Sequence, residues 1–208
     1  MNDFVELELL RNRGWPWPEY SWGLTPMFGE DGWCRGCGVP LRPQSGSIVL
    51  QRRGFARVEG AWVPNWQFDA ICLERSLSDI AAARFAVDLL PVAWDDDPIS
   101  EAMQIVVPSV GDAWFDPDEL RERTKARHGA SGAECSTCGI WRWLPLPSEE
   151  LPRLRIESFP EGVAIAASPE WFGDGWQAFR QILVRRDLAG LIAGASPRDF
   201  RLRDSFGL

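Results

Sequence analysis

The sequence predicts an α+β fold built on a split zinc ribbon, in which two distant segments hold one metal ion. Two observations predict it: the pattern Cys-x-x-Cys-Gly occurs at 34–38 and again at 135–139, and strand-like and helix-like segments surround both copies. A two-residue spacer lets two thiolates converge on one ion, and glycine tolerates the positive φ of the tight turn. Four thiolates form the full ligand set of a structural zinc site. The predicted zinc ligands are Cys34, Cys37, Cys135 and Cys138.

The two knuckles, as we call 34–38 and 135–139, are separated by an unusually long segment, because 97 residues lie between Cys37 and Cys135. A shared ion therefore makes about 44–130 a large α/β insertion, followed by a C-terminal strand–helix–strand element at about 160–204. A chain of 208 residues suits one domain, so 1–208 is expected to form a single unit. No internal repeat is evident beyond the two knuckles.

Two other interpretations of the cysteines remain open at this level. Trp33-Cys34-Arg35-Gly36-Cys37 superficially resembles a thioredoxin-like redox motif, but its Gly- and Pro-rich flanks do not suit the strand-to-helix unit that such chemistry needs. Disulfides are the second alternative. The fifth cysteine, Cys72, makes the count odd and no secretory signal is visible, so disulfides are disfavoured.

The segments up to the second knuckle show short strand patterns and two helices. Strands are expected at 4–10, 47–51, 67–72 and 103–108, an extended segment at 88–94, and an amphipathic helix at 74–87 with Leu77, Ile80, Ala81 and Phe85 near one face. Cys72 is expected to be a small buried apolar residue. A second helix should begin after the N-cap Asp116 and end at Gly129. His128 in its last turn is a possible but unnecessary ligand.

The C-terminal part predicts two strands, at 140–144 and 163–167, before the strongest helical pattern of the chain. That helix should run from Asp174 to about Ile192, because Asp174 and Gln177 have capping-box spacing and an apolar stripe begins at Trp176. A closing strand is expected at 199–202.

Composition limits the classes of function. The net charge is −8, with −9 over residues 1–150 and +1 over 151–208. This acidity disfavours a nucleic-acid partner and favours a basic one, unless it serves solubility alone. The run Asp95–Asp97 is expected to be a solvated loop. No targeting or membrane-spanning segment is visible, so a soluble cytoplasmic protein is expected.

The search for catalytic motifs predicts that the protein is not an enzyme. The chain has one histidine and one tyrosine, and it lacks a nucleophile elbow, a phosphate loop, a dinucleotide fingerprint and a metalloprotease helix. Its twelve tryptophans are the other outlier in composition. Most are expected in the core, whereas exposed ones are candidate anchors at a binding interface.

The two Cys-x-x-Cys-Gly elements, about half the chain apart, together with the C-terminal run from Ile165 through Arg180 to Leu188, resemble the double-CXXCG motif family. This family includes immunity proteins of the Sit swarming-inhibition systems of social gliding bacteria, which protect kin from a lipoprotein toxin passed between cells. The resemblance implies a cytoplasmic immunity protein that binds its cognate toxin, and among site residues it implies only the four cysteines. A basic nuclease would suit the acidic chain. The alternatives are a zinc-ribbon adaptor for another protein and, less favoured, a nucleic-acid binder.

Overall fold

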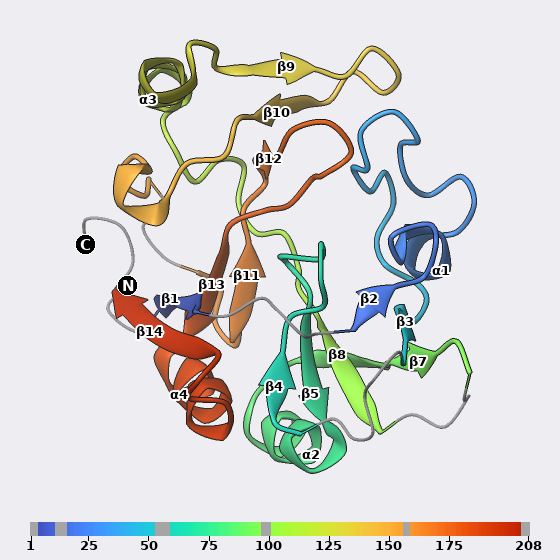
Figure 1. Ribbon diagram of the computed structural model, residues 1–208. Coiled ribbons are helices and arrows are strands. Elements are labelled where there is room, and N and C mark those ends of the chain that lie inside the picture. The colour runs from blue at the N-terminus through green and yellow to red at the C-terminus, as the bar shows by residue number, and fades with distance from the viewer. Residues whose placement is uncertain (1–3, 11–15, 53–58, 97–100, 156–158, 205–208) are drawn as a thin grey trace.

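A computed structural model describes residues 4–10, 16–52, 59–96, 101–155 and 159–204 and has an α+β fold (Figure 1). One four-stranded antiparallel sheet has the order β11-β13-β1-β14, with strands Ile165–Ala167, Ile182–Arg185, Phe4–Leu9 and Phe200–Asp204. The other has the order β4-β5-β8-β6, with strands Ala61–Trp62, Ile71–Glu74, Ala102–Val106 and Asp88–Pro91. Each sheet carries one ten-residue helix, α4 (Arg186–Ala195) and α2 (Arg75–Arg84) respectively.

The two sheets repeat one topology. In each, a short strand pairs with a second strand that leads directly into the helix, and the strand after the helix returns to the far side of a central strand. The register also agrees. The first residue of the central strand, Phe4 in β1 or Ala102 in β8, lies opposite the last residue before the helix, Arg185 or Glu74. The next residue along each central strand lies opposite the last residue of the outer strand, Asp204 or Pro91.

The chain is therefore built from two copies of one motif, each with a first strand, a knuckle, two strands, a helix and a last strand. The first strands are exchanged between the copies, because β1 lies in the sheet of the second copy and β8 in the sheet of the first. The repeat therefore extends beyond the knuckles, and the expectation from the sequence that there is no further internal repeat is wrong. Four residues of 68–77 (Phe, Ile, Arg and Leu at 68, 71, 75 and 77) recur at the equivalent places of 179–188, and the rest of the likeness is one of pairing and register.

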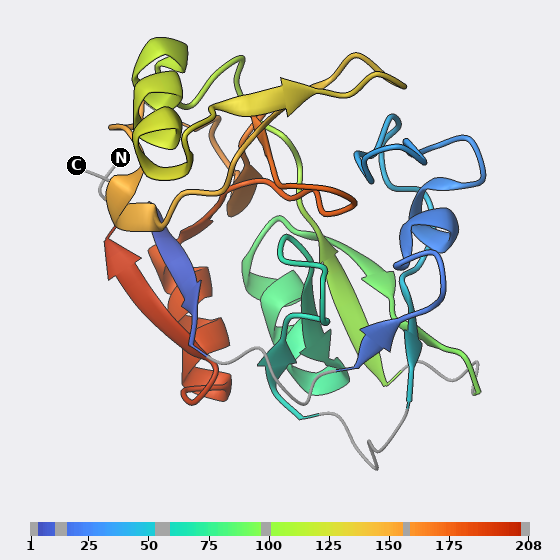
Figure 2. The same ribbon diagram turned by 45° about the horizontal axis from the view of Figure 1, so that its top comes forward.

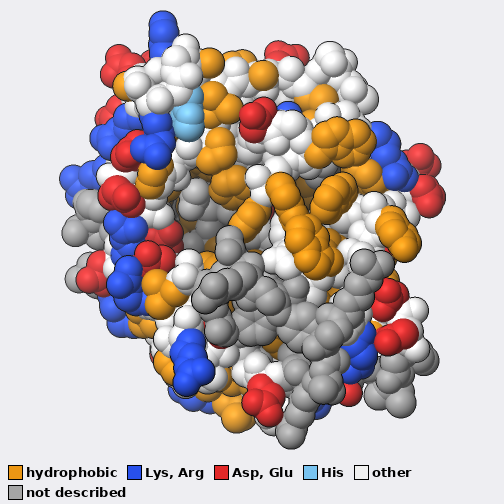
Figure 3. Space-filling model, viewed as in Figure 1, with side chains coloured by type: hydrophobic (Ala, Val, Ile, Leu, Met, Phe, Trp, Pro, Cys, Tyr) orange, Lys and Arg blue, Asp and Glu red, His pale blue; other side chains and the backbone are white. Residues whose placement is uncertain are grey.

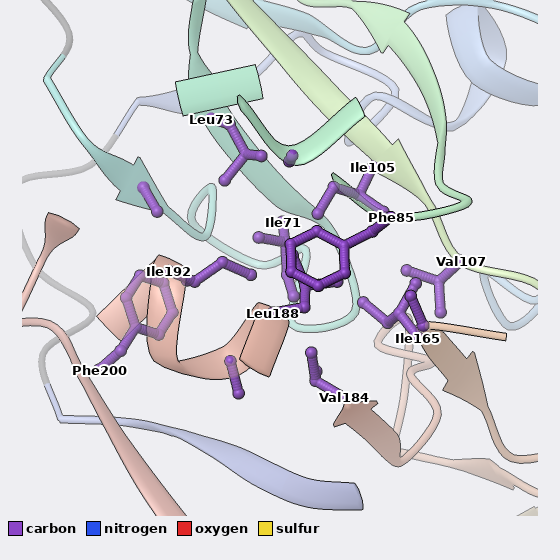
Figure 4. Close-up of a cluster of buried hydrophobic side chains, with 14 of the residues drawn as sticks. Ile71, Leu73, Phe85, Ile105, Val107, Ile165, Val184, Leu188, Ile192 and Phe200 are labelled. Carbon is purple, nitrogen blue, oxygen red and sulfur yellow. The ribbon is translucent and has the colours of Figure 1, made fainter. Parts of the chain in front are cut away.

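The main hydrophobic core lies between the two copies (Figure 4). Leu73 and Leu77 of the first copy pack in one buried cluster with Val184 and Leu188, which take the same places in the second. In Figures 1 and 2, α2 and α4 lie side by side at the same end of the molecule. Because each helix covers its own sheet and also contacts the other helix, one apolar core serves both copies.

Both knuckles lie at the end of the molecule opposite α2 and α4, and smaller elements complete the fold there and beside β8 (Figures 1 and 2). Three-stranded sheets are formed by β2 (Trp17–Pro18), β3 (Val49–Gln51) and β7 (Ala93–Trp94), and by β12 (Trp171–Phe172), β10 (Trp141–Trp143) and β9 (Gly132–Glu134). The remaining helices are α1 (Leu24–Phe28), α3 (Pro117–His128) and the 3-10 turn η1 (Ser148–Glu150).

Most elements expected from the sequence are confirmed within a few residues. The helix α3 begins and ends as predicted: the Asp116 carboxylate accepts hydrogen bonds from the backbone N–H groups of Asp118 and Glu119, and Gly129 has a φ of 77°. The helix α2 also forms, although Ile80 is 47% exposed and not on its buried face.

The helix predicted from Asp174 to Ile192 is wrong in its first half. Asp174 is no helix cap: its carboxylate accepts from Gly175 N–H, and Gly175 has a φ of 55°, which ends any helical turn there. The run at 182–185 forms β13, because it can pair with β1 on one side and β11 on the other. Only the last part of the segment, α4, is helical, since its apolar stripe covers the sheet. Long-range strand pairing overrides the local helical pattern.

Candidate metal centre and tryptophan pocket

Both knuckles adopt the same hydrogen-bonded turn. In the first, Cys34 N–H donates to Val39 C=O and Gly38 N–H donates to Cys34 C=O, each at 2.8 Å. In the second, Cys135 N–H donates to Ile140 C=O at 3.0 Å and Gly139 N–H to Cys135 C=O at 2.8 Å. The closing glycines have φ values of 76° and 73°, in the left-handed region that side chains rarely adopt. The sequence pattern therefore fixes the local geometry twice.

The fold brings all four predicted ligands together, with every Sγ within 4.8 Å of the others. Cys34 Sγ lies 3.8 Å from Cys135 Sγ, and Cys37 Sγ lies 3.7 Å from Cys138 Sγ. A disulfide needs about 2.05 Å, and all four thiols are free. A tetrahedral ion with metal–sulfur bonds of about 2.3 Å separates its ligands by about 3.8 Å. The cluster could thus hold a metal ion, and its donor set is consistent with zinc.

Backbone hydrogen bonds and burial shift the pKa values of the thiols in opposite directions. The N–H groups of Cys138 and Thr137 donate to the Cys135 sulfur and lower the pKa of this thiol to about 6. Burial raises the pKa of Cys37 and of Cys138. Hydrogen bonds aimed at a sulfur favour the thiolate, which is the form that binds metal. The two hydrogen bonds to Cys135 therefore favour the thiolate form that a metal ion needs as its ligand.

The two knuckles pack closely against each other, and hydrogen bonds from one arginine stabilise their arrangement. A Cβ added at Gly36 would lie 2.6 Å from Thr137 Oγ1, so the tips of the knuckles touch. Arg142 of β10 donates to the backbone carbonyls of Cys37 (3.3 Å), Gly175 (2.9 Å) and Gln177 (3.2 Å). One guanidinium thus joins β10, the strand that follows the second knuckle, to the first knuckle and to the loop that follows β12.

Contacts between equivalent residues of the two copies extend from the metal centre into the interior. Such self-matching contacts mark an approximate twofold axis. The pairs that meet are Cys34 with Cys135, Cys37 with Cys138, Gly36 with Thr137, Phe68 with Phe179 (ring centroids 5.8 Å apart), and Asp69 with Arg180 (3.5 Å). The four-cysteine cluster lies where the copies meet, and each copy supplies two thiols.

Two other candidates from the sequence lie away from the cluster. His128 is hydrogen-bonded through Nε2 to Pro145 C=O at 2.8 Å and is not among the clustered residues. Cys72 is fully buried in a separate hydrophobic cluster with Trp62 and Trp94, as expected for a small apolar residue. Neither residue approaches the four sulfurs.

A pocket of about 520 Å³ lies beside the first knuckle and was not predicted. We call it the tryptophan pocket; it is lined by Trp22, Leu24, Gly38, Trp66, Gln67, Asp174, Trp176, Gln177 and Ala178. Its indoles are well exposed, at 38% for Trp22, 46% for Trp66 and 59% for Trp176. Figure 3 shows hydrophobic side chains gathered around a hollow on this face of the molecule. The repeated dipeptide Trp-Gln at 66–67 and 176–177 was the signal that could have found it.

Two of these tryptophans are held in an unusual backbone conformation. Trp22 (φ 58°) and Trp66 (φ 67°) are the non-glycine residues with positive φ in the described part of the chain, and both line this pocket. Their ring centroids are 5.7 Å apart. Left-handed backbone at a bulky residue costs roughly 1–3 kcal/mol and tends to occur where it positions functional groups. Here the strained backbone of these two residues directs both indole rings to the tryptophan pocket.

The acidic run at 95–97 is only partly within the described residues, because Asp97 lies outside them. Asp95 accepts from the backbone N–H of Arg52 at 3.2 Å, and Asp96 pairs with the Arg52 side chain at 3.5 Å. Part of the charge of this run is thus balanced internally.

No helix in the described ranges has the length and apolar character needed to cross a lipid bilayer. No protein-family model matches this sequence, and no curated protein matches it.

Proposed function

We propose that this protein is a cytoplasmic immunity protein that binds and neutralises a cognate toxin delivered by a lipoprotein. We propose further that a structural zinc ion bound by Cys34, Cys37, Cys135 and Cys138 completes a split zinc ribbon. The four clustered thiols and the matching turns of the two knuckles support the metal. The resemblance of the paired motifs to the double-CXXCG family supports the immunity role.

The observation that carries a binding function is the set of exposed indoles around the tryptophan pocket. Tryptophan is among the residues that contribute most to binding energy at interfaces, and solvent exposure of three such rings on one hollow costs stability without a partner. The pocket adjoins the metal centre through Gly38, whose added Cβ would lie 2.5 Å from Trp176 C=O. A metal ion in the centre would therefore hold the binding surface in place.

The acidic character of the chain fits a basic toxin. Nuclease toxins are commonly basic because their substrate carries phosphates, and an inhibitor with a net charge of −8 can compete for such a surface. Complementary charges also speed association, which a protein that must intercept a toxin requires. We expect a 1:1 complex that forms faster at low salt.

Co-expression with the toxin encoded beside the gene tests the proposal. Cells that express the toxin should survive with this protein and die without it, and the two proteins should co-purify. The Cys135→Ser variant should lose protection because the surface beside the metal centre is no longer held. Death of cells that contain both wild-type proteins, with no complex formed, would reject the immunity role in favour of an adaptor for another protein.

A further inference from the structure

We propose that the tryptophan pocket binds the guanidinium group of an arginine side chain presented by a basic partner protein. The identity of that partner as a toxin rests on the proposed function, whereas the chemistry of the pocket does not. Pockets of this size commonly combine an aromatic lining with a few polar groups that fix orientation. Here the lining selects a cation.

The charge of the lining is the first argument. Asp174 is the one charged residue among those that line the pocket, and it is exposed to solvent. The other polar groups are the amides of Gln67 and Gln177, and no lysine or arginine contributes. Indole faces carry negative electrostatic potential and attract cations. Three indoles and one carboxylate therefore favour a positive group and oppose an anion.

Elsewhere in the protein, arginine side chains stack on two buried indoles and on one that is half-buried. Arginine guanidinium carbons lie over tryptophan rings at Arg35–Trp33 (4.0 Å), Arg52–Trp94 (4.6 Å) and Arg180–Trp171 (5.1 Å). Within the described residues, no arginine covers the rings of Trp22, Trp66 or Trp176. The pocket thus offers uncovered tryptophan rings for the cation–π contact that the arginines of this chain make with other tryptophans.

The pocket is also held in shape before a partner arrives. Gln67 is 8% exposed and its side chain donates to Trp22 C=O, which ties the two tryptophan-bearing turns together. Arg142 holds the loop around Trp176 through the carbonyls of Gly175 and Gln177. Fixed rings reduce the entropy that binding must overcome. A planar guanidinium stacks on such rings better than the compact ammonium of lysine, so we assign arginine.

The first experiment uses two blocked pentapeptides, one with a central arginine between glycines and one with citrulline in its place. Citrulline has nearly the same shape and no charge. In ¹⁵N spectra of the zinc-loaded protein, the arginine peptide at millimolar concentration should shift the indole N–H signals of Trp22, Trp66 and Trp176. The citrulline peptide should bind about tenfold more weakly. Equal binding of both peptides, or binding of neither, would overturn the proposal.

Matched variants identify the residues responsible. Trp176→Leu and Asp174→Asn should each weaken the arginine peptide about fivefold or more, and the effect of Asp174→Asn should shrink at high salt. The controls are Trp141→Leu, which removes an indole 39% exposed outside the pocket, and Glu122→Gln on the exposed face of α3. Both controls should bind like the wild type. Equal losses in controls and pocket variants would contradict the assignment. Unchanged melting temperatures show that the exposed substitutions leave the fold intact.

The same variants separate this proposal from the immunity role. If the wild type protects cells and the pocket variants protect less than the controls, the arginine site is used in toxin capture. If all variants protect equally, the identification of the toxin as the partner of the pocket is overturned while the immunity role stands, and the peptide titration decides whether the arginine site exists. If the wild type itself does not protect, the immunity role fails and the peptide titration alone decides whether the arginine site exists.

Discussion

At the scale of single residues, the cysteines differ in what their surroundings do for them. Cys34 and Cys37 are buried, whereas Cys135 and Cys138 are only partly so. Cys135 receives two backbone N–H groups that lower the pKa of its thiol to about 6. Cys72 is equally buried but has no thiol neighbours, and burial alone raises the pKa of its thiol. Burial thus does not identify a ligand, and convergence with other sulfurs does.

Replacement of Cys135 by serine should abolish metal binding and unfold the region around the knuckles. A structural thiolate zinc ion can contribute on the order of 10 kcal/mol to folding, so the loss of one ligand outweighs the stability of a small domain. Native protein should contain about one zinc per chain by elemental analysis, and Cys135→Ser should lose it and melt much earlier.

Cys72→Ala is the control, because Cys72 lies in a different cluster from the four thiols and should leave the zinc content unchanged. Native protein that contains no metal and carries a Cys34–Cys37 disulfide instead would refute the zinc site.

At the scale of elements, the two copies of the motif are joined by an ion pair that is largely shielded from solvent. Asp69 precedes β5 and Arg180 precedes β13 at equivalent places, and their side chains are 16% and 18% exposed. Arg180 also lies over the ring of Trp171. Burial raises the pKa of Asp69 although the Arg180 guanidinium opposes that shift. The pair is therefore costly to desolvate and still more costly to break.

Removal of one partner should destabilise the protein more than removal of both. Asp69→Leu leaves the Arg180 charge buried and unpaired, and the free energy of unfolding should fall by about 3 kcal/mol in urea titrations. The double variant Asp69→Leu with Arg180→Met replaces the pair by apolar groups and should recover most of this loss. Additive losses from the two single variants would show that the residues are not coupled.

The same pair predicts a pH dependence. Because the pKa of Asp69 is raised in the folded state, the folded chain holds this proton to a higher pH than the unfolded chain. The free energy of unfolding should accordingly fall as the pH rises from the unfolded pKa of about 4 through the folded pKa. The Asp69→Asn variant should lack this part of the slope.

At the scale of the whole molecule, the chain behaves as two interlocked copies of one motif. Each four-stranded sheet takes its central strand from the other copy, and the metal centre takes two thiols from each. A central strand supplies hydrogen bonds to both neighbours, so a copy without it has two unpaired strand edges. Neither half can complete its sheet or its metal site alone.

Residues 1–99 and 100–208 should therefore remain unfolded when expressed separately and reassemble when mixed with zinc. We expect a 1:1 complex with one zinc ion, the far-ultraviolet circular dichroism of the intact protein, and a single cooperative melting transition. Size-exclusion chromatography would measure the stoichiometry of the complex, and elemental analysis would measure its zinc content. A fragment 1–99 that folds as a stable monomer would contradict the exchanged-strand arrangement, because that fragment lacks β8.

The sequence by itself determined the features that depend on neighbours along the chain. The spacing within each knuckle and the following glycine specify a turn that can form without any distant contact, and Asp116 with Gly129 sets both ends of α3. Even the convergence of four cysteines could be predicted, because four thiolates match the needs of one ion.

Only the tertiary structure decided the rest. The segment at 182–185 follows a helical pattern locally, but pairing with β11 on one side and with β1, from the other end of the chain, on the other side outweighs that preference. Most of the repeat is not evident from the sequence, because it consists of register between strands that are distant along the chain, such as β1 with β13. The tryptophan pocket likewise assembles rings from residues 22, 66 and 176. Contacts between residues so far apart depend on the global packing of apolar faces and on hydrogen-bond pairing between sheets, which local periodicity does not encode.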